Sequence, residues 1–238
     1  MGTITHIGKT AEDIAEVFAG NLLNWVCETR DAPFHLALSG GKTPSLLFSL
    51  LAEEYAITMP WQKIHFWWGD ERMVPRDNPE NNFGVVNERL LKKIEIPVGN
   101  IHRIQGEGFP EIESKRYRIE IKTFLPEVGG WPYFDLVMLG LGDDGHTASI
   151  FPDQMQLLES DQVTAIATHP LSGQKRITLT GKVINNAKRV AFLVSGESKA
   201  PIYNEIIHNT ENSIHYPAAH IHPNGELHWF VDNKARFL

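Results

Sequence analysis

Residues 134–152 read FDLVMLGLGDDGHTASIFP, and this stretch decides the fold of the chain. Its first half is a nearly continuous apolar run, which is typical of a central parallel strand covered on both faces. The run stops at a glycine-rich turn that carries two carboxylates and an imidazole, on Asp143, Asp144 and His146. Because ligands bind outside the carboxyl ends of strands in an open α/β sheet, we expect a functional site at this turn. The alternative is a turn whose polar residues only cap a helix.

The composition is that of an ordinary soluble globular protein, and 238 residues are enough for one large α/β domain. A formal net charge of -7 without a long basic run argues against a general binder of nucleic acid or of a membrane surface. No apolar run is long enough to span a bilayer, so we expect a cytoplasmic protein. The single cysteine, Cys27, excludes an internal disulfide, and its place on an apolar helical face predicts a packed thiol.

Hydrophobic periodicity predicts a single domain, residues 1–238, in which strands and helices alternate. Strands are expected at residues 34–38, 64–68, 134–139, 163–168, 176–180, 190–194 and 227–231. Helices are expected at residues 10–28, 45–55, 82–94, 111–125 and 201–207, the third with Asn81 or Asn82 as its N-cap. A further short helix is expected to begin near Thr147 and to end near Pro152. The predicted core faces are Ile14, Val17, Phe18, Leu22 and Trp25 in the first helix and Ile112, Tyr117, Ile121 and Phe124 in the fourth.

A second glycine turn, SGGKTP at residues 39–44, joins a predicted strand to a predicted helix. Such a turn directs backbone N–H groups at an anion beside the helix N-terminus. A Walker A motif is excluded, because Leu36 stands where its first glycine is required, and no GxGxxG dinucleotide motif is present in this turn. A phosphate monoester is therefore the expected anion, and a tight turn without a ligand is the alternative.

Charged residues also follow the strand predicted at residues 64–68, in the order Asp70, Glu71 and Arg72. Taken alone they are typical of a solvated loop, but their recurrence at several strand ends favours a site. The histidines near the C-terminus raise the question of a metal, yet no HExxH pattern accompanies them and acidic partners at ligand spacing are sparse. We therefore predict no metal site at His208, His215, His220, His222 and His228.

Several segments together resemble the 6-phosphogluconolactonase family, which shares a superfamily with the glucosamine-6-phosphate deaminases. The segments are SGGKTP at 39–44, WGDER at 68–72 with Val74 and Pro75, GLGDDGHTASIFP at 140–152, RITL at 176–179, and Lys199 with Ala200. The resemblance implies an α/β fold with a Rossmann-like, mostly parallel sheet and helices on both faces. It also implies hydrolysis of the phosphorylated sugar lactone 6-phospho-D-glucono-1,5-lactone to 6-phosphogluconate in the oxidative pentose phosphate pathway. We further expect a monomer or weak homo-oligomer that needs no cofactor.

The residue chemistry suits this reaction, which needs a positioned water, a general base, an oxyanion donor and a proton for the leaving ring oxygen. His146 is expected to take the water proton and return it to the leaving oxygen. Asp144 is expected to orient the imidazole, with Asp143 as the alternative, because the sequence does not decide which carboxylate points inward. Arg72 is expected to neutralise the oxyanion, and Asp70 to hold Arg72 or substrate hydroxyls.

The phosphate group is expected at the glycine turn, with an arginine and a lysine brought from later strands. Arginine suits bidentate phosphate recognition, whereas lysine acts as a point charge. Asn82 occupies the position of an asparagine that is common in the family. The expected substrate-binding residues are Ser39, Gly40, Gly41, Lys42, Thr43, Asn82, Arg176 and Lys199.

Two other functions fit parts of the pattern. The deaminase branch carries a glutamate five residues after the histidine, but this chain has Phe151 there, and an apolar side chain cannot relay a proton for ring opening. A non-catalytic sugar-phosphate sensor is the other alternative, although no DNA-binding segment is fused to the chain and His146 with its acids would be superfluous for binding alone.

Overall fold

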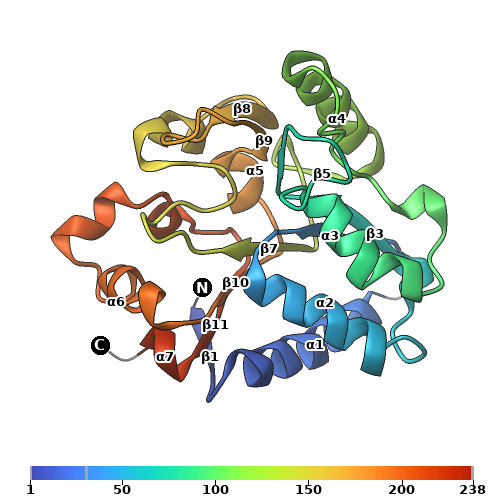
Figure 1. The fold of residues 1–238 in the computed structure, drawn as a ribbon, viewed down its shortest axis with the longest axis horizontal. Helices are drawn as coiled ribbons and strands as arrows, with labels where there is room; N and C mark the ends of the chain where they lie inside the picture. Colours follow the sequence, from blue (N-terminus) through green and yellow to red (C-terminus); the bar gives the residue numbers. More distant parts are fainter. Residues whose placement is uncertain (1, 30–31, 237–238) are drawn as a thin grey trace.

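The computed structural model describes residues 2–29 and 32–236, and its centre is a six-stranded parallel sheet (Figure 1). The strands lie in the order β1-β11-β10-β7-β2-β3. Their bounds are β1 Thr3–Gly8, β2 Phe34–Leu38, β3 Ile64–Trp68, β7 Leu136–Gly140, β10 Arg189–Val194 and β11 Glu226–Asp232. The prediction of an α/β fold around a mostly parallel sheet is confirmed.

Helices cover both faces of this sheet because its strands carry large apolar side chains alternately on either side. On one face, Trp68 of β3 packs edge-on against Phe83 of α3, and on the other face Trp67 packs against Tyr117 of α4. The helices are α1 Ala11–Glu28, α2 Lys42–Glu54, α3 Asn82–Arg89, α4 Pro110–Phe124, α5 Gly181–Asn185, α6 Ala200–Ile207 and α7 Asn233–Arg236. Figure 1 shows α1 and α2 side by side on one flank, with α6 and α7 together on another.

A second, antiparallel sheet of three short strands stands beside the central one, in the order β4-β9-β8. Its strands are β4 Asp70–Arg72, β9 Lys175–Leu179 and β8 Thr164–Thr168, and a hairpin joins β5 Glu127–Val128 to β6 Trp131–Pro132. The sequence predicted β8 and β9 as strands but not this separate sheet. β4 is too short and too charged to be recognised from periodicity. Its pairing with β9 places Arg72 opposite Arg176.

Some local expectations were wrong. No helix begins at Thr147, because Ala148 has a φ of +48° and a β-bridge joins Thr147 to Ile150. A 3-10 helix begins only at Pro152. The helix predicted to run to residue 94 ends at Arg89.

The 3-10 helices are η1 Trp61–Lys63, η2 Leu91–Lys93, η3 Val98–Asn100, η4 Pro152–Leu158, η5 Glu197–Lys199, η6 Glu211–His215 and η7 Pro217–His220.

Burial also differs from the prediction at a few positions. Val17 is exposed at the side of the buried stripe of α1, and Cys27 is exposed because the stripe ends on Trp25 and Val26. Helix α4 buries Tyr117 and Ile121, but Ile112 and Phe124 are exposed at its two ends. Strand β1 was not predicted, since it lies at the edge of the sheet and is largely exposed. Within the described ranges no helix has the length and apolar character needed to cross a bilayer.

Candidate active site

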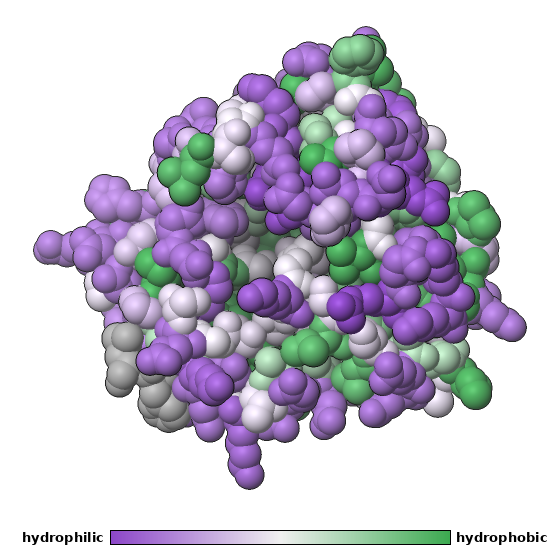
Figure 2. All heavy atoms as spheres, viewed as in Figure 1, coloured by the Kyte–Doolittle hydropathy of each residue, from purple (hydrophilic) through white to green (hydrophobic). Residues whose placement is uncertain are grey.

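A cavity of about 230 Å³ lies at the carboxyl ends of β2 and β7, where β4 and β9 pass beside the central sheet. Figure 2 shows one face of the molecule hollowed near its middle, with mainly hydrophilic residues around the hollow. The structure brings together, as lining of the cavity, most of the predicted site residues: Ser39, Gly40, Gly41, Asp70, Arg72, His146, Arg176 and Lys199. The cavity thus lies where polar residues follow several strands.

His146 and Asp144 form a hydrogen-bonded pair beside this cavity. Nδ1 of His146 lies 2.5 Å from Oδ1 of Asp144, which also accepts the backbone N–H of His146 at 3.1 Å. Burial alone would raise the pKa of Asp144, but the hydrogen bond and charge of His146 outweigh burial and lower that pKa to about 2. An ionised carboxylate fixes the proton of a neutral imidazole on Nδ1 and leaves Nε2 as a proton acceptor.

Asp143 has a different partner. Its carboxylate accepts a 2.6 Å hydrogen bond from Nζ of Lys199, and this bond lowers the pKa of Asp143. Of the two adjacent carboxylates, the structure therefore places Asp144 on the imidazole and Asp143 on the lysine.

Two arginines face one another across the strand pair β4 and β9. Among the described residues neither Arg72 nor Arg176 forms an ion pair with a carboxylate, and Nε of Arg72 is buried without a hydrogen-bond partner. Nη1 of Arg72 donates to the backbone oxygen of Glu80 at 2.9 Å. Burial, together with the charge of Arg72, lowers the pKa of Arg176. Two adjacent guanidinium groups without a carboxylate provide a site for an anion.

Asp70 and Phe151 lie close to these groups and differ in their contacts. The carboxylate of Asp70 accepts a 2.6 Å hydrogen bond from Ser149, so within the described structure it contacts Ser149 and not the guanidinium of Arg72. The buried ring of Phe151 lies 4.9 Å from the ring of His146, and the guanidinium of Arg176 lies over it at 5.5 Å. Phe151 thus contacts both a predicted base and a predicted phosphate ligand.

A second cavity of about 510 Å³ adjoins the first at the N-terminus of α2. Gly41 is the N-cap of this helix, has a φ of +117°, and provides no side-chain cap for the first N–H groups. Thr43 and Lys42 line this cavity instead of the one with His146. Lys199 lines both cavities, so a ligand that spans them meets the helix N-terminus at one end and the imidazole at the other.

Asn82 supports the site without lining the cavity that holds His146. It is buried, donates from Nδ2 to the backbone oxygen of Asp70 at 3.0 Å, and lies against Gly40. A Cβ on Gly40 would stand 1.9 Å from Oδ1 of Asn82, which explains the need for glycine at this point of the turn. Asn82 also lines a separate cavity together with Arg72. Its role in substrate binding stays a prediction.

Four polar residues near the two cavities were not among the predicted site residues. Ser149 bonds Asp70, Ser195 shares a 2.6 Å hydrogen bond with Thr43, Ser198 lines the second cavity, and the ring of His169 packs on Phe151. Ser195 and Ser198 follow β10, so the rule that ligands gather at strand ends was a signal that pointed to them. The partners of Ser149 and His169 depend on pairings between distant segments.

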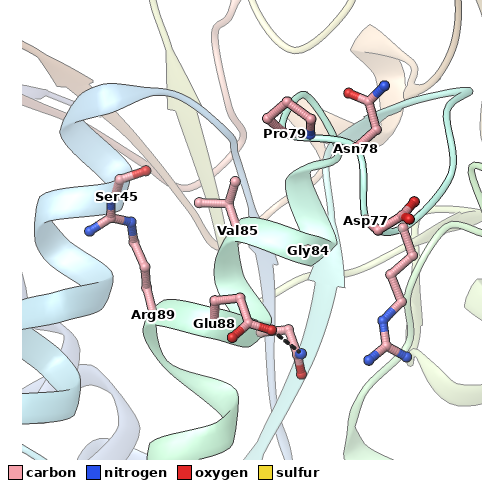
Figure 3. A pocket seen from close by; sticks show the side chains of 10 residues that line it. Ser45, Asp77, Asn78, Pro79, Gly84, Val85, Glu88 and Arg89 are labelled. Carbon is pink, nitrogen blue, oxygen red and sulfur yellow. Dashed lines mark hydrogen bonds between the residues drawn. The ribbon is translucent and has the colours of Figure 1, made fainter.

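A larger cavity of about 690 Å³ lies between α2, the loop at residues 76–79 and α3 (Figure 3). Ser45 and Arg89 lie together on one wall, while Asp77 lies across the opening. This cavity is not lined by His146, Arg72 or Arg176, so its larger volume does not make it the reactive site. In the part of the chain that the structure describes, no group of three or more His, Cys, Asp or Glu side chains is arranged to hold a metal ion.

Glu71 stands between Asp70 and Arg72 and is fully buried. Burial raises the pKa of Glu71 to about 7, against the effect of three backbone N–H bonds that lower it. Between about pH 4.5, the ordinary pKa of a glutamate, and about pH 7, the folded protein therefore binds up to one proton more than the unfolded chain. Stability from this group is present below this interval and is lost as the pH rises through it.

We expect the free energy of unfolding of wild type, relative to Glu71→Gln, to fall by up to about 3 kcal/mol between about pH 4.5 and pH 8. Urea unfolding of both proteins at several pH values measures this difference. A difference that does not change with pH would contradict the raised pKa.

Comparison with known proteins identifies the family of the chain. Residues 9–229 match the family described as glucosamine-6-phosphate isomerases/6-phosphogluconolactonase. The chain is 47% identical over 205 residues to the 6-phosphogluconolactonase of Haemophilus influenzae, covering 85% of this chain and 86% of that protein. The crystal structure of devB protein matches with a TM-score of 0.93 and 41% identity over 98% of both chains. A monomeric glucosamine-6-phosphate deaminase, 21% identical with a TM-score of 0.81 over 98% of both chains, shares the fold. The chain belongs to the glucosamine-6-phosphate isomerase/6-phosphogluconolactonase family.

Proposed function

We propose that this chain hydrolyses 6-phospho-D-glucono-1,5-lactone to 6-phosphogluconate, the second step of the oxidative pentose phosphate pathway. One observation carries the proposal: the His146–Asp144 pair opens on a cavity that also holds Arg72, Arg176 and Lys199. A base and cationic side chains that line one cavity suit a substrate that carries both a reactive carbonyl and a phosphate. The relatives named 6-phosphogluconolactonase support the same reaction.

In this reaction Nε2 of His146 takes a proton from the attacking water as the water oxygen bonds to the lactone carbonyl carbon. The negative charge that develops on the carbonyl oxygen is neutralised by the guanidinium of Arg72, which lines the same cavity as His146. The bond between the carbonyl carbon and the ring oxygen then breaks, and His146 returns the proton to that oxygen. Asp144 stabilises the imidazolium between the two steps.

The phosphate is bound at the other end of the substrate. The proposed cationic partners are Lys199, which lines both cavities, and Arg176, which lines the cavity with His146. The uncapped N-terminus of α2 provides backbone N–H groups. Thr43 and Ser195 add hydroxyl groups there, joined by their own hydrogen bond in the structure. The exposed Lys42 lies at the edge of the second cavity and contributes charge at longer range.

Deamination of glucosamine 6-phosphate is the second candidate, because a deaminase has the same fold. Ring opening needs a proton relay beside the histidine, but the side chain that packs against His146 here is the fully buried, apolar Phe151. This contact favours the lactonase. A cytoplasmic location and a monomeric or weakly oligomeric state stay predictions.

Substrate choice tests the proposal directly. The purified protein should hydrolyse freshly generated 6-phosphogluconolactone faster than the spontaneous background and should release no ammonia from glucosamine 6-phosphate. Both assays use the same preparation, so activity in one assay shows that the protein is folded and serves as the control for a negative result in the other. Ammonia release without lactone consumption would assign the chain to the deaminase branch instead.

A further inference from the structure

Glu71 is the one charged residue of β4 that does not line the cavity. Successive side chains of a strand point to opposite sides, so Asp70 and Arg72 face the cavity while Glu71 faces the start of α3. Its side chain is fully buried, and no lysine, arginine or histidine of the described residues pairs with it. A carboxylate buried without a cation is unfavourable unless it accepts several hydrogen bonds.

Those hydrogen bonds come from three backbone N–H groups, each at 2.8 Å. Oε1 of Glu71 accepts from Arg72 and Asn82, and Oε2 accepts from Phe83. Asn82 and Phe83 are the first two residues of α3, where N–H groups have no helical partner and where negative charge is favoured. The carboxylate therefore joins β4 to the start of α3, although the chain makes a loop of nine residues, 73–81, between them.

Two of these contacts lead directly to the cavity. The bond from the N–H of Arg72 fixes the backbone from which the guanidinium extends. The bond from the N–H of Asn82 fixes a side chain whose Nδ2 holds the backbone oxygen of Asp70 and whose Oδ1 lies against Gly40. A single carboxylate thus sets the relative positions of β4, α3 and the glycine turn.

We propose that Glu71 is a positioning residue for the hydrolytic site, which acts through Arg72 and without touching the substrate. This inference rests on the proposed lactonase activity. Arg72 is expected to stabilise the negative charge on the carbonyl oxygen, which develops only during the reaction. A displacement of Arg72 should therefore lower kcat by a larger factor than it raises KM.

Glu71→Gln tests this role with little change of shape. The amide has one acceptor oxygen instead of two, so its NH2 group must face either Phe83 or the pair Arg72 and Asn82, all of which are donors. At about pH 8, above the raised pKa of Glu71, we expect kcat to fall about 10- to 100-fold with a smaller change in KM. Rates are divided by the folded fraction, measured by circular dichroism and thermal unfolding.

Asp135→Asn is the matched control. Asp135 is also a carboxylate whose pKa is raised by burial, and it accepts the backbone N–H of His35 at 2.9 Å. It precedes β7, at the opposite end of the strand from the cavity. Its variant should keep its kcat per folded molecule.

A double-mutant cycle with Arg72→Ala separates positioning from a general effect on folding. If Glu71 acts through Arg72, then Glu71→Gln should lower kcat less than about 2-fold further in the Arg72→Ala background. If the losses in kcat from Glu71→Gln and Arg72→Ala multiply in the double variant, Glu71 does not act through Arg72. A kcat of Glu71→Gln within about 2-fold of wild type would also contradict the positioning role.

Glu71→Asp replaces Glu71→Gln if the latter does not fold. The shorter side chain keeps the charge but cannot reach both Arg72 and Phe83, so the same cycle and the same outcomes apply. A wild-type protein that does not accelerate lactone hydrolysis would contradict the proposed function. An active wild type with an unimpaired Glu71 variant would contradict only this inference.

Discussion

Gly142→Ala is expected to lower kcat for the lactone by about 100- to 1,000-fold while the protein stays folded. A Cβ at residue 142 would stand 2.1 Å from Nδ1 of His146 and 2.6 Å from Oδ1 of Asp144, so these side chains cannot keep their places. The imidazole is the end of a partly exposed side chain, with 28% exposure, so it can move away without disturbing the core. The change therefore separates the His146–Asp144 pair at little cost in stability.

Steady-state kinetics and thermal unfolding of Gly142→Ala measure these two effects together. Gly20→Ala is the control, since a Cβ there comes within 4 Å of no atom beyond its chain neighbours and the local backbone of its own helix, α1. Its kcat should equal that of wild type. A Gly142→Ala protein with wild-type kcat would show that the observed imidazole position is not needed for hydrolysis.

Arg176→Gln and Lys199→Met are each expected to raise KM for the phosphorylated lactone by about 10- to 100-fold, because hydrogen bonds to charged groups contribute about 1.5–3 kcal/mol. Both residues line the cavity with His146, and Lys199 also faces the N-terminus of α2. If they bind the phosphate, the variants should differ little from wild type with unphosphorylated glucono-1,5-lactone.

The control for charge alone is Lys92→Met. Lys92 is exposed on η2, where its partner is Glu88, and it lines neither of the two cavities. Its KM should stay at the wild-type value. Equal losses of the two site variants on phosphorylated and unphosphorylated lactones would instead place Arg176 and Lys199 at the reacting carbonyl.

Much of the fold follows from local sequence patterns. Strands β2 and β3 were predicted with their observed bounds, because a buried parallel strand is a short apolar run that ends abruptly in a polar turn. Strands β1 and β4 were not predicted: β1 lies exposed at an edge, and β4 consists of three charged residues whose pairing with β9 is antiparallel and distant in sequence. Pairings of this kind are set by tertiary packing and leave no periodic signal.

The place of the candidate site also followed from local patterns, whereas several of its contacts did not. Strand ends and glycine turns indicated where His146 and Arg72 would meet, since parallel strands bring their carboxyl ends to one edge. The choice between Asp143 and Asp144 depended on the backbone of a turn in which Gly145 has a φ of +81°. Contacts such as Ser149 with Asp70, or Glu71 with the start of α3, join segments that only the folded chain brings together.

The central claim is that His146 takes the proton from the attacking water, and one comparison tests it most directly. The consumption of freshly generated 6-phosphogluconolactone should be measured for wild type, for His146→Ala and for buffer alone, at equal concentrations of folded protein. Wild type should exceed the spontaneous rate clearly, and His146→Ala should lose at least about 100-fold in kcat with a much smaller change in KM. A His146→Ala protein that hydrolyses the lactone as fast as wild type would contradict the assignment of His146 as the base.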